Sequence, residues 1–209
     1  MIKILVADDH AVVRRGLIQI LTEYSDLTVV GEAQDAQELF TLVRSQAWDI
    51  VILDVSMPGR GGLDVLKELK SDFPERPVLI LSGHPEDQYA VRTLKAGAAG
   101  YLTKDSAPDE LVTALRKAMQ GGKYVSATLA EKLAFNLTPE SDCLPHEALS
   151  DREFQVMCRI ASGKTVSEIA DEFSLSVKTI STYRTRILEK MNLKNNAELT
   201  HYAIQNGLG

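Results

Sequence analysis

The residues with the clearest chemical potential are three aspartates that follow apolar stretches of this 209-residue chain. Asp8 and Asp9 come directly after IKILVA, and Asp54 ends DIVILD. Ser82 ends PVLILS, and Lys104 follows GYLT. Neighbouring carboxylates repel one another, so a group of three stays ionised only beside a balancing cation. Mg²⁺ takes carboxylates, carbonyls and water as ligands in proteins, so these residue types indicate a magnesium site.

The same residues could transfer a phosphoryl group to a carboxylate. Asp54 is the candidate nucleophile, because carboxylates accept phosphoryl groups as aspartyl phosphates. Lys104 would hold a phosphoryl oxygen, and Ser82 would donate a hydrogen bond from its hydroxyl. Catalysis would then come mainly from positioning and from charge neutralisation by Mg²⁺ and Lys104. Each residue alone is more often a loop or surface residue, so the interpretation depends on their joint placement.

Alternating strand and helix patterns must bring these residues together. Strand-like segments at 2–7, 27–33, 49–54, 77–82 and 100–103 alternate with helical patterns near 11–23, 35–46, 61–71, 85–96 and 107–120. This alternation predicts an α/β fold with a doubly wound, five-stranded parallel sheet of the flavodoxin-like type. Ligands collect at the carboxyl ends of the strands in such sheets. All five polar residues are therefore expected at one edge.

The C-terminal part of the chain has helical patterns and no strand candidate. Ser150 and Glu153 form an S-x-x-E capping box that begins its first helix. TVSEIADEF and VKTISTYRTRILEKM follow, joined by a short turn at SLS. Two helices joined by a tight turn indicate a helix-turn-helix, whose second helix can enter the major groove of DNA.

The second of these helices presents a candidate DNA-binding face. At about 100° per residue, Ile180, Ile187 and Met191 point inward. Hydroxyls that suit base edges, and cations that suit phosphates, lie on the outward side and its flank. These candidate contacts are Lys178, Ser181, Thr182, Tyr183, Thr185, Arg186 and Lys190. Glu189 also points outward, where it could contact a cytosine amino group, pair with a cation or lie beyond the DNA.

Composition and charge support two domains in a protein without a membrane partner. We expect one domain at 1–120, a linker with a short helix at 121–147, and a second domain at 148–209. From residue 150 onward, eight basic and seven acidic residues give a net charge of +1. Because the whole chain has a net charge of −6, residues 1–149 carry −7. No apolar run reaches the ~20 residues of a membrane span and no signal peptide opens the chain, which favours the cytoplasm. Cys143 is expected in the linker and Cys158 in the second core.

KILVADDH, VILDVSMPGRGG, LILSG and GYLTK together resemble the receiver domain of two-component response regulators. The resemblance implies that Asp54 is the phosphoacceptor, and that Ser82 and Tyr101 form a switch pair. It implies that Mg²⁺ is held by the residues Asp9, Asp54 and the backbone carbonyl of Ser56, with Asp8 acting nearby or through water. Asp105 departs from the proline that many receivers carry after the lysine. His10 is expected to serve the loop, because no other residue pairs with it as a ligand.

The C-terminal pattern LSDRE … G … EIA … LSVKTI resembles the LuxR-type DNA-binding domain. With the receiver pattern in front, the chain resembles the NarL/FixJ family, and within it the BvgA and GacA/UvrY-like regulators. The implied function is transcription control by phosphorylation, rather than enzymatic turnover of a separate substrate, although a receiver would catalyse its own phosphoryl transfer and dephosphorylation. The implied partners are a sensor histidine kinase, double-stranded promoter DNA, a second copy of the chain and RNA polymerase.

By the same resemblance, the last helix, near 197–206, would pair two DNA-binding domains. Its apolar residues Leu199, Tyr202 and Ala203 could equally belong to the core of their own domain.

Two other functions stay open on the sequence. An aspartyl-phosphate phosphatase also uses an aspartate nucleophile with Mg²⁺, but in that class a D-x-D motif ends the first strand, whereas this chain has adjacent aspartates there. A regulator that binds DNA independently of phosphorylation is the second alternative, against which the complete set of five pocket residues argues.

Overall fold

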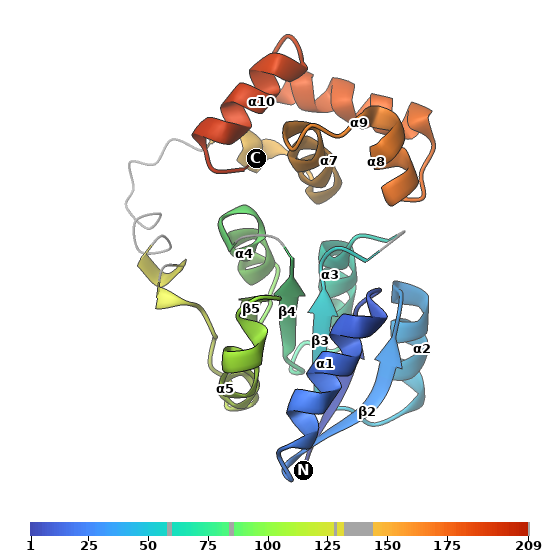
Figure 1. Ribbon diagram of the computed structural model, residues 1–209, viewed down its shortest axis with the longest axis vertical. Helices are drawn as coiled ribbons and strands as arrows, with labels where there is room; N and C mark the ends of the chain where they lie inside the picture. Colours follow the sequence, from blue (N-terminus) through green and yellow to red (C-terminus); the bar gives the residue numbers. More distant parts are fainter. Residues whose placement is uncertain (58–59, 84–85, 128, 132–143, 209) are drawn as a thin grey trace. The chain divides into compact units, whose positions relative to one another are not determined.

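The computed structural model describes residues 1–57, 60–83, 86–127, 129–131 and 144–208 (Figure 1). The contacts divide the chain into two compact units, Met1–Lys132 and Leu133–Gly209. Part of the predicted linker, residues 128 and 132–143 with Cys143 among them, lies outside the described residues, and residues 127 and 129–131 are helical. Within the described ranges, every helix is too short or too polar to cross a membrane.

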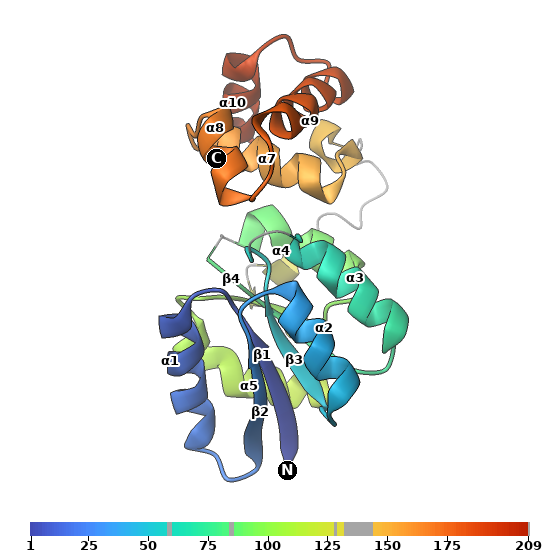
Figure 2. The ribbon, with the colours of Figure 1, turned by 90° about the vertical axis from the view of Figure 1, so that its right-hand side faces the viewer.

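The N-terminal unit is a parallel five-stranded sheet with helices on both faces, as predicted. Its strands are β1 (Ile2–Ala7), β2 (Leu27–Ala33), β3 (Ile50–Asp54), β4 (Val78–Ser82) and β5 (Gly100–Thr103), in the spatial order β2-β1-β3-β4-β5. Its helices are α1 (Ala11–Thr22), α2 (Ala36–Ser45), α3 (Gly62–Asp72), α4 (Glu86–Lys95) and α5 (Ala107–Met119). α1 and α5 cover one face, and α2 and α3 lie on the other (Figure 2).

The central strands are buried because both faces of the sheet are covered. Every residue of β3 and β4 is buried, which explains their unbroken apolar sequences IVIL and VLIL. The strand register pairs Ala7 with Leu53, Asp54 with Leu81, and Ser82 with Thr103. The carboxyl ends of four strands therefore meet at one edge of the sheet, where the candidate residues lie.

Gly62 lets the chain return closely past the end of β3. A Cβ atom at this position would lie 2.6 Å from the carbonyl oxygen of Asp54 and 2.5 Å from the Cα of Val55. Contacts this short with backbone atoms leave no room for a side chain. The glycine at the first residue of α3 therefore allows the helix to begin directly against the strand that carries the candidate phosphoacceptor.

The C-terminal unit is helical and contains the predicted helix-turn-helix. It comprises η1 (Pro145–Ala148), α7 (Asp151–Ala161), α8 (Val166–Glu172), α9 (Val177–Lys190) and α10 (Asn196–Gln205). Ser150 and Glu153 form the predicted capping box of α7, and Thr165 and Glu168 form a second one on α8. Ile180, Ile187 and Met191 are buried, as predicted, and so is Cys158.

The structure answers the question of the apolar residues on the last helix. Leu199 and Ala203 are fully buried within the unit, and the Tyr202 hydroxyl lies 2.8 Å from Nδ1 of His146 in η1. Leu199 and Ala203 therefore belong to the core of their own domain and Tyr202 lies at its edge, while the pairing of two domains by this helix stays a prediction. The large apolar side chain that α10 does expose is Ile204, at 66%.

Candidate functional site

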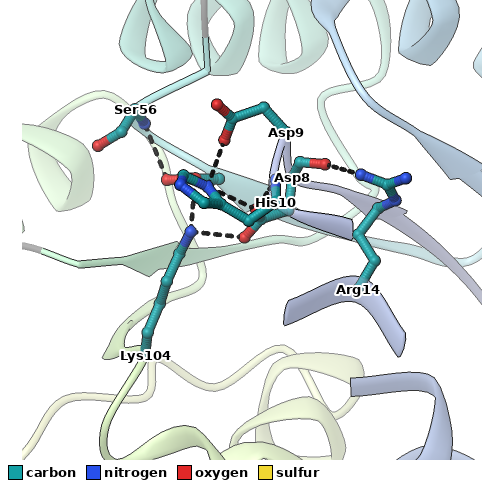
Figure 3. Close-up of polar contacts among 7 residues, drawn as sticks. Asp8, Asp9, His10, Arg14, Ser56 and Lys104 are labelled. Carbon is teal, nitrogen blue, oxygen red and sulfur yellow. Dashed lines mark hydrogen bonds and ion pairs between the residues drawn. The ribbon is translucent and has the colours of Figure 1, made fainter. Parts of the chain in front are cut away.

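Lys104 joins two buried carboxylates at the carboxyl edge of the sheet (Figure 3). Its Nζ lies 2.7 Å from Oδ2 of Asp8 and 2.8 Å from Oδ2 of Asp54. The Asp8 and Asp54 side chains are 1% and 0% exposed, and that of Lys104 is 18% exposed. The three residues come from the ends of β1, β3 and β5. As the strand pattern predicted, residues that are far apart in the sequence, Asp8, Asp54 and Lys104, are in direct contact at this edge of the sheet.

Backbone groups hold the second oxygen of each buried carboxylate. The Ser56 N–H donates to Oδ1 of Asp54 at 2.8 Å, and the His10 N–H donates to Oδ1 of Asp8 at 2.7 Å. The Lys104 N–H donates to the Ser82 carbonyl at 2.8 Å, which fixes the loop after β5. The described residues contain no cis peptide bond, so Asp105 follows Lys104 on a trans bond.

The cluster has the composition of a cation site. One ligand atom each from Asp8, Asp9, His10 and Asp54 lies within 4.8 Å of the others. Three carboxylates against the single ammonium of Lys104 leave an excess of two negative charges when His10 is neutral. Hard divalent cations bind such oxygen groups, so this cluster could hold a metal ion. The Ser56 carbonyl stays a predicted ligand.

Burial and neighbouring opposite charges have opposing effects on the pKa values of Asp54 and Lys104. Burial raises the pKa of Asp54, and repulsion by Asp8 adds to this, whereas Lys104 and the Ser56 N–H oppose it without cancelling it. Burial alone would lower the pKa of Lys104, but its bonds to Asp54 and Asp8 outweigh that effect and raise it. The charged form of Lys104 is therefore favoured, whereas the ionised form of Asp54 is disfavoured, and an additional cation beside it would stabilise it.

The predicted switch residues lie on the neighbouring strands. Ser82 is the last residue of β4 and Tyr101 lies in β5, and both are fully buried. Ser82 follows Leu81, the register partner of Asp54, so it lies at the same edge as the candidate phosphoacceptor. Their movement on phosphorylation stays a prediction.

Sequence reasoning missed Arg14, which supports the turn that carries the aspartates. Its Nη1 donates to the carbonyl oxygen of Asp8 at 2.6 Å, and its Nε lies 3.4 Å from Oε2 of Glu32 in β2. The Arg14 side chain is 15% exposed. The only local signal for this role is a cation on the first turns of the helix that follows the acidic loop.

The candidate DNA-binding residues lie on one helix, α9, and most are exposed. The exposed members are Lys178, Ser181, Thr182, Thr185, Arg186 and Lys190, and Tyr183 is half-buried.

Two cations of α9 already have partners inside the domain. Nζ of Lys190 lies 2.6 Å from Oε2 of the buried Glu153 in α7, and Arg184 donates from Nε to Oδ1 of Asn196. Lys190 therefore holds α9 against α7, which its sequence position alone did not indicate.

Comparison with known proteins identifies both units. Residues 4–116 match the family profile of the response regulator receiver domain, and residues 147–203 match that of bacterial regulatory proteins of the luxR family. The response regulator UvrY of Escherichia coli K12 is 38% identical over 209 residues, covering 100% of this chain and 96% of UvrY. The response regulator GacA of Pseudomonas aeruginosa is also 38% identical, covering 100% of this chain and 98% of GacA.

A solved structure shares the same architecture. RcsB from Salmonella enterica serovar Typhimurium, bound to the promoter rprA in the presence of the phosphomimetic BeF3⁻, has a TM-score of 0.69 and 28% identity. The match covers 96% of this chain and 97% of RcsB. Since the profiles match both units and the alignments cover 96% of UvrY and 98% of GacA, the likeness to the GacA and UvrY regulators is confirmed. This chain belongs to the NarL/FixJ family of two-component response regulators, the DNA-binding regulators that join a receiver domain to a LuxR-type helix-turn-helix domain.

Proposed function

We propose that a sensor histidine kinase controls this regulator by Mg²⁺-dependent phosphorylation of Asp54, and that the phosphorylated form binds promoter DNA as a dimer. The observation that carries the proposal is the Lys104 bridge between two buried carboxylates at the edge of the receiver sheet. We propose the cytoplasm as the site of this activity, since promoter DNA is one of the proposed partners. RNA polymerase is a further candidate partner at the promoter.

The receiver residues fit the proposed ion. Asp9, Asp54 and the Ser56 carbonyl would hold Mg²⁺, with Asp8 beside them or acting through water, and the bound ion would offset the charge of the phosphoryl oxygens. The excess of carboxylate over ammonium in the cluster supports this assignment.

The phosphoryl transfer then follows from the geometry of Asp54. One carboxylate oxygen of Asp54 attacks the phosphorus, its new O–P bond forms as the P–N bond of the kinase phosphohistidine breaks, and the kinase imidazole leaves. The Ser56 N–H keeps the carboxylate in place through Oδ1. Lys104, now paired with Oδ2, would move to a phosphoryl oxygen, and Ser82 would donate its hydroxyl hydrogen to another.

The DNA-binding step uses the exposed face of α9. RcsB, which shares the architecture, has been solved on promoter DNA. In this chain we expect Ser181, Thr182 and Thr185 to face base edges, and Lys178, Tyr183 and Arg186 to face the backbone. Lys190 is expected to contribute less than its neighbours, because Glu153 already neutralises its charge.

Light scattering after gel filtration tests the switch. Wild type, Asp54→Ala and the matched control Asp105→Ala, an exposed aspartate, are each run with Mg²⁺ and acetyl phosphate or beryllofluoride. The wild type and the control should become dimers, while Asp54→Ala stays in its starting state. Intact mass should show one phosphoryl group retained on the wild type.

Two outcomes would contradict the proposal. Steady phosphate release without retention would favour the aspartyl-phosphate phosphatase. Equal promoter binding by the wild type and Asp54→Ala would favour regulation independent of phosphorylation.

A further inference from the structure

One side chain of the acidic pocket has no part in the phosphoryl transfer described above: the imidazole of His10. Its Nδ1 lies 2.7 Å from Oδ1 of Asp9 and 3.4 Å from Oδ1 of Asp8. Figure 3 shows the ring turned toward these carboxylates, and the side chain is 63% exposed. The sequence favoured a loop role for His10 because no partner for a ligand role was evident. The structure provides such partners.

The spacing of these atoms fits ligands that share one ion. In an octahedral site with bonds of about 2.1 Å, neighbouring ligand atoms lie about 3.0 Å apart and opposite ones about 4.2 Å apart. The distances from Nδ1 to the two aspartate oxygens, 2.7 and 3.4 Å, lie on either side of the first value. All four candidate ligand atoms lie within 4.8 Å of one another, so shifts of a few tenths of an ångström would suffice.

Lys104 contacts other carboxylate oxygens than those that lie near His10. Its Nζ contacts Oδ2 of Asp8 and Oδ2 of Asp54. The atoms near His10 are instead Oδ1 of Asp8 and Oδ1 of Asp9. The ammonium and an ion coordinated by His10 would therefore use different oxygens of Asp8.

An imidazole ligand changes which ions a site prefers. As a ligand, Nδ1 of His10, which lies 2.7 Å from Oδ1 of Asp9, would carry no proton, and the ring proton would be on Nε2. Mg²⁺ prefers oxygen ligands, whereas Co²⁺, Ni²⁺ and Zn²⁺ bind imidazole nitrogen well. Replacing one water ligand by His10 would therefore add affinity for these ions and little for Mg²⁺.

We propose that His10 is an additional ligand of the receiver ion site, and that it shifts the selectivity of this site from Mg²⁺ toward Co²⁺, Ni²⁺ and Zn²⁺. The inference rests on the proposed function, because it takes the acidic pocket to be the ion site of the phosphoryl transfer. The receiver would then be sensitive to low concentrations of these ions.

Metal titrations of the full chain test this selectivity. Wild type, His10→Ala and the control His201→Ala, an exposed histidine of the other unit, are titrated with Mg²⁺ and separately with Co²⁺. His10→Ala should weaken Co²⁺ binding by at least about tenfold, the smallest loss typical of residues that support a metal site. It should change the Kd for Mg²⁺ far less, and His201→Ala should change neither Kd.

Proton NMR of the Co²⁺-loaded protein gives a direct reading of coordination. A histidine bound to Co²⁺ shows a strongly shifted, exchangeable imidazole N–H resonance, which should be present in the wild type and in His201→Ala and absent in His10→Ala. Equal loss of affinity for both ions, or the lack of this resonance in the wild type, overturns the ligand role.

Intact mass separates this inference from the proposed function. If the wild type takes up a phosphoryl group with Mg²⁺ and acetyl phosphate but lacks the Co²⁺ preference, only the role of His10 fails. If the wild type binds neither ion, the ion site itself fails, and the proposed function fails with it.

Discussion

Replacing Asp54 by asparagine should leave the metal-free receiver at least as stable as the wild type, although it breaks a buried ion pair. The ligand oxygens of Asp8, Asp9 and Asp54 lie within 4.8 Å of one another. At an effective dielectric constant of 20, each pair of charges repels by about 3.5 kcal/mol or more, so Asp54 experiences roughly 7 kcal/mol of repulsion. Its attraction to Lys104 at 2.8 Å is about 6 kcal/mol on the same scale.

These two effects nearly cancel, so the burial of the Asp54 charge decides the sign. Asparagine has the same shape and can still accept the hydrogen bond from the Ser56 N–H. Lys104 keeps Asp8 as its partner. We expect Asp54→Asn to change the free energy of unfolding by between zero and about +2 kcal/mol, in contrast to the loss of about 3–5 kcal/mol that is usual when a buried pair loses one member.

The pH dependence has a definite sign. Because burial raises the pKa of Asp54, the folded receiver binds this proton more tightly than the unfolded chain does. The stability of the wild type therefore falls as pH rises from the ordinary value of 3.8 through the raised pKa. The advantage of Asp54→Asn should be largest at neutral pH and disappear below the ordinary value.

Urea unfolding in EDTA measures this effect in the receiver alone. Trp48, the single tryptophan of the chain, is 2% exposed within the N-terminal unit, so its fluorescence reports that unit. The exposed aspartate variant Asp105→Asn is the matched control and should change stability little. A loss of more than about 2 kcal/mol in Asp54→Asn, beyond that of the control, would refute the reasoning, because it would mean that the Lys104 pair dominates.

Three further substitutions test other parts of the structure. Gly62→Ala should destabilise the receiver by about 1–3 kcal/mol and slow its phosphorylation by acetyl phosphate, because the new Cβ would lie 2.6 Å from the Asp54 carbonyl oxygen. An unchanged midpoint of urea unfolding, followed by Trp48 fluorescence, would contradict this. Lys190→Met should cost the C-terminal unit about 1.5–3 kcal/mol, measured by hydrogen exchange of α7 and α9, because it leaves Glu153 buried without its cation. Burial raises the pKa of Glu153, but the bonds to Lys190 and Ser150 outweigh burial and hold this pKa below the ordinary value of 4.5. The wild-type unit should therefore lose stability as pH falls below that value, and Lys190→Met should flatten this dependence. Arg186→Ala should lower the salt dependence of promoter binding by about one unit of slope, as removal of one phosphate contact does; an unchanged slope would place this side chain off the DNA backbone.

The features that could be predicted from the sequence are those with a local cause. The strands LTVVGEA and GYLT have the predicted bounds, because turn residues and apolar runs delimit them within a few positions. The capping box of Ser150 and Glu153 was readable for the same reason. The convergence of the pocket residues followed from one topological rule for parallel sheets.

The features that could not be predicted depend on contacts between distant residues. Lys190, on the flank of the outward face of α9, stays a predicted DNA contact, but its ion pair with Glu153, 37 residues earlier, has no signal in the sequence. Leu199 is buried because α10 packs against α7. The helix pattern alone fitted equally well a residue in the core and a residue that pairs two domains. Arg14 supports the acidic turn through a backbone carbonyl, and a carbonyl has no sequence signature.

The threonine hydroxyls of α9 carry a consequence for the operator sequence. The hydroxyl of Thr182 donates its hydrogen to the carbonyl of Lys178, and that of Thr185 donates to the carbonyl of Ser181. With their hydrogens engaged inside the helix, these oxygens offer only lone pairs to DNA. In the major groove they match the amino groups of adenine and cytosine rather than the O6 and N7 acceptors of guanine, and their methyl groups suit thymine. Binding sites selected from random DNA should therefore show adenine or cytosine opposite these two side chains.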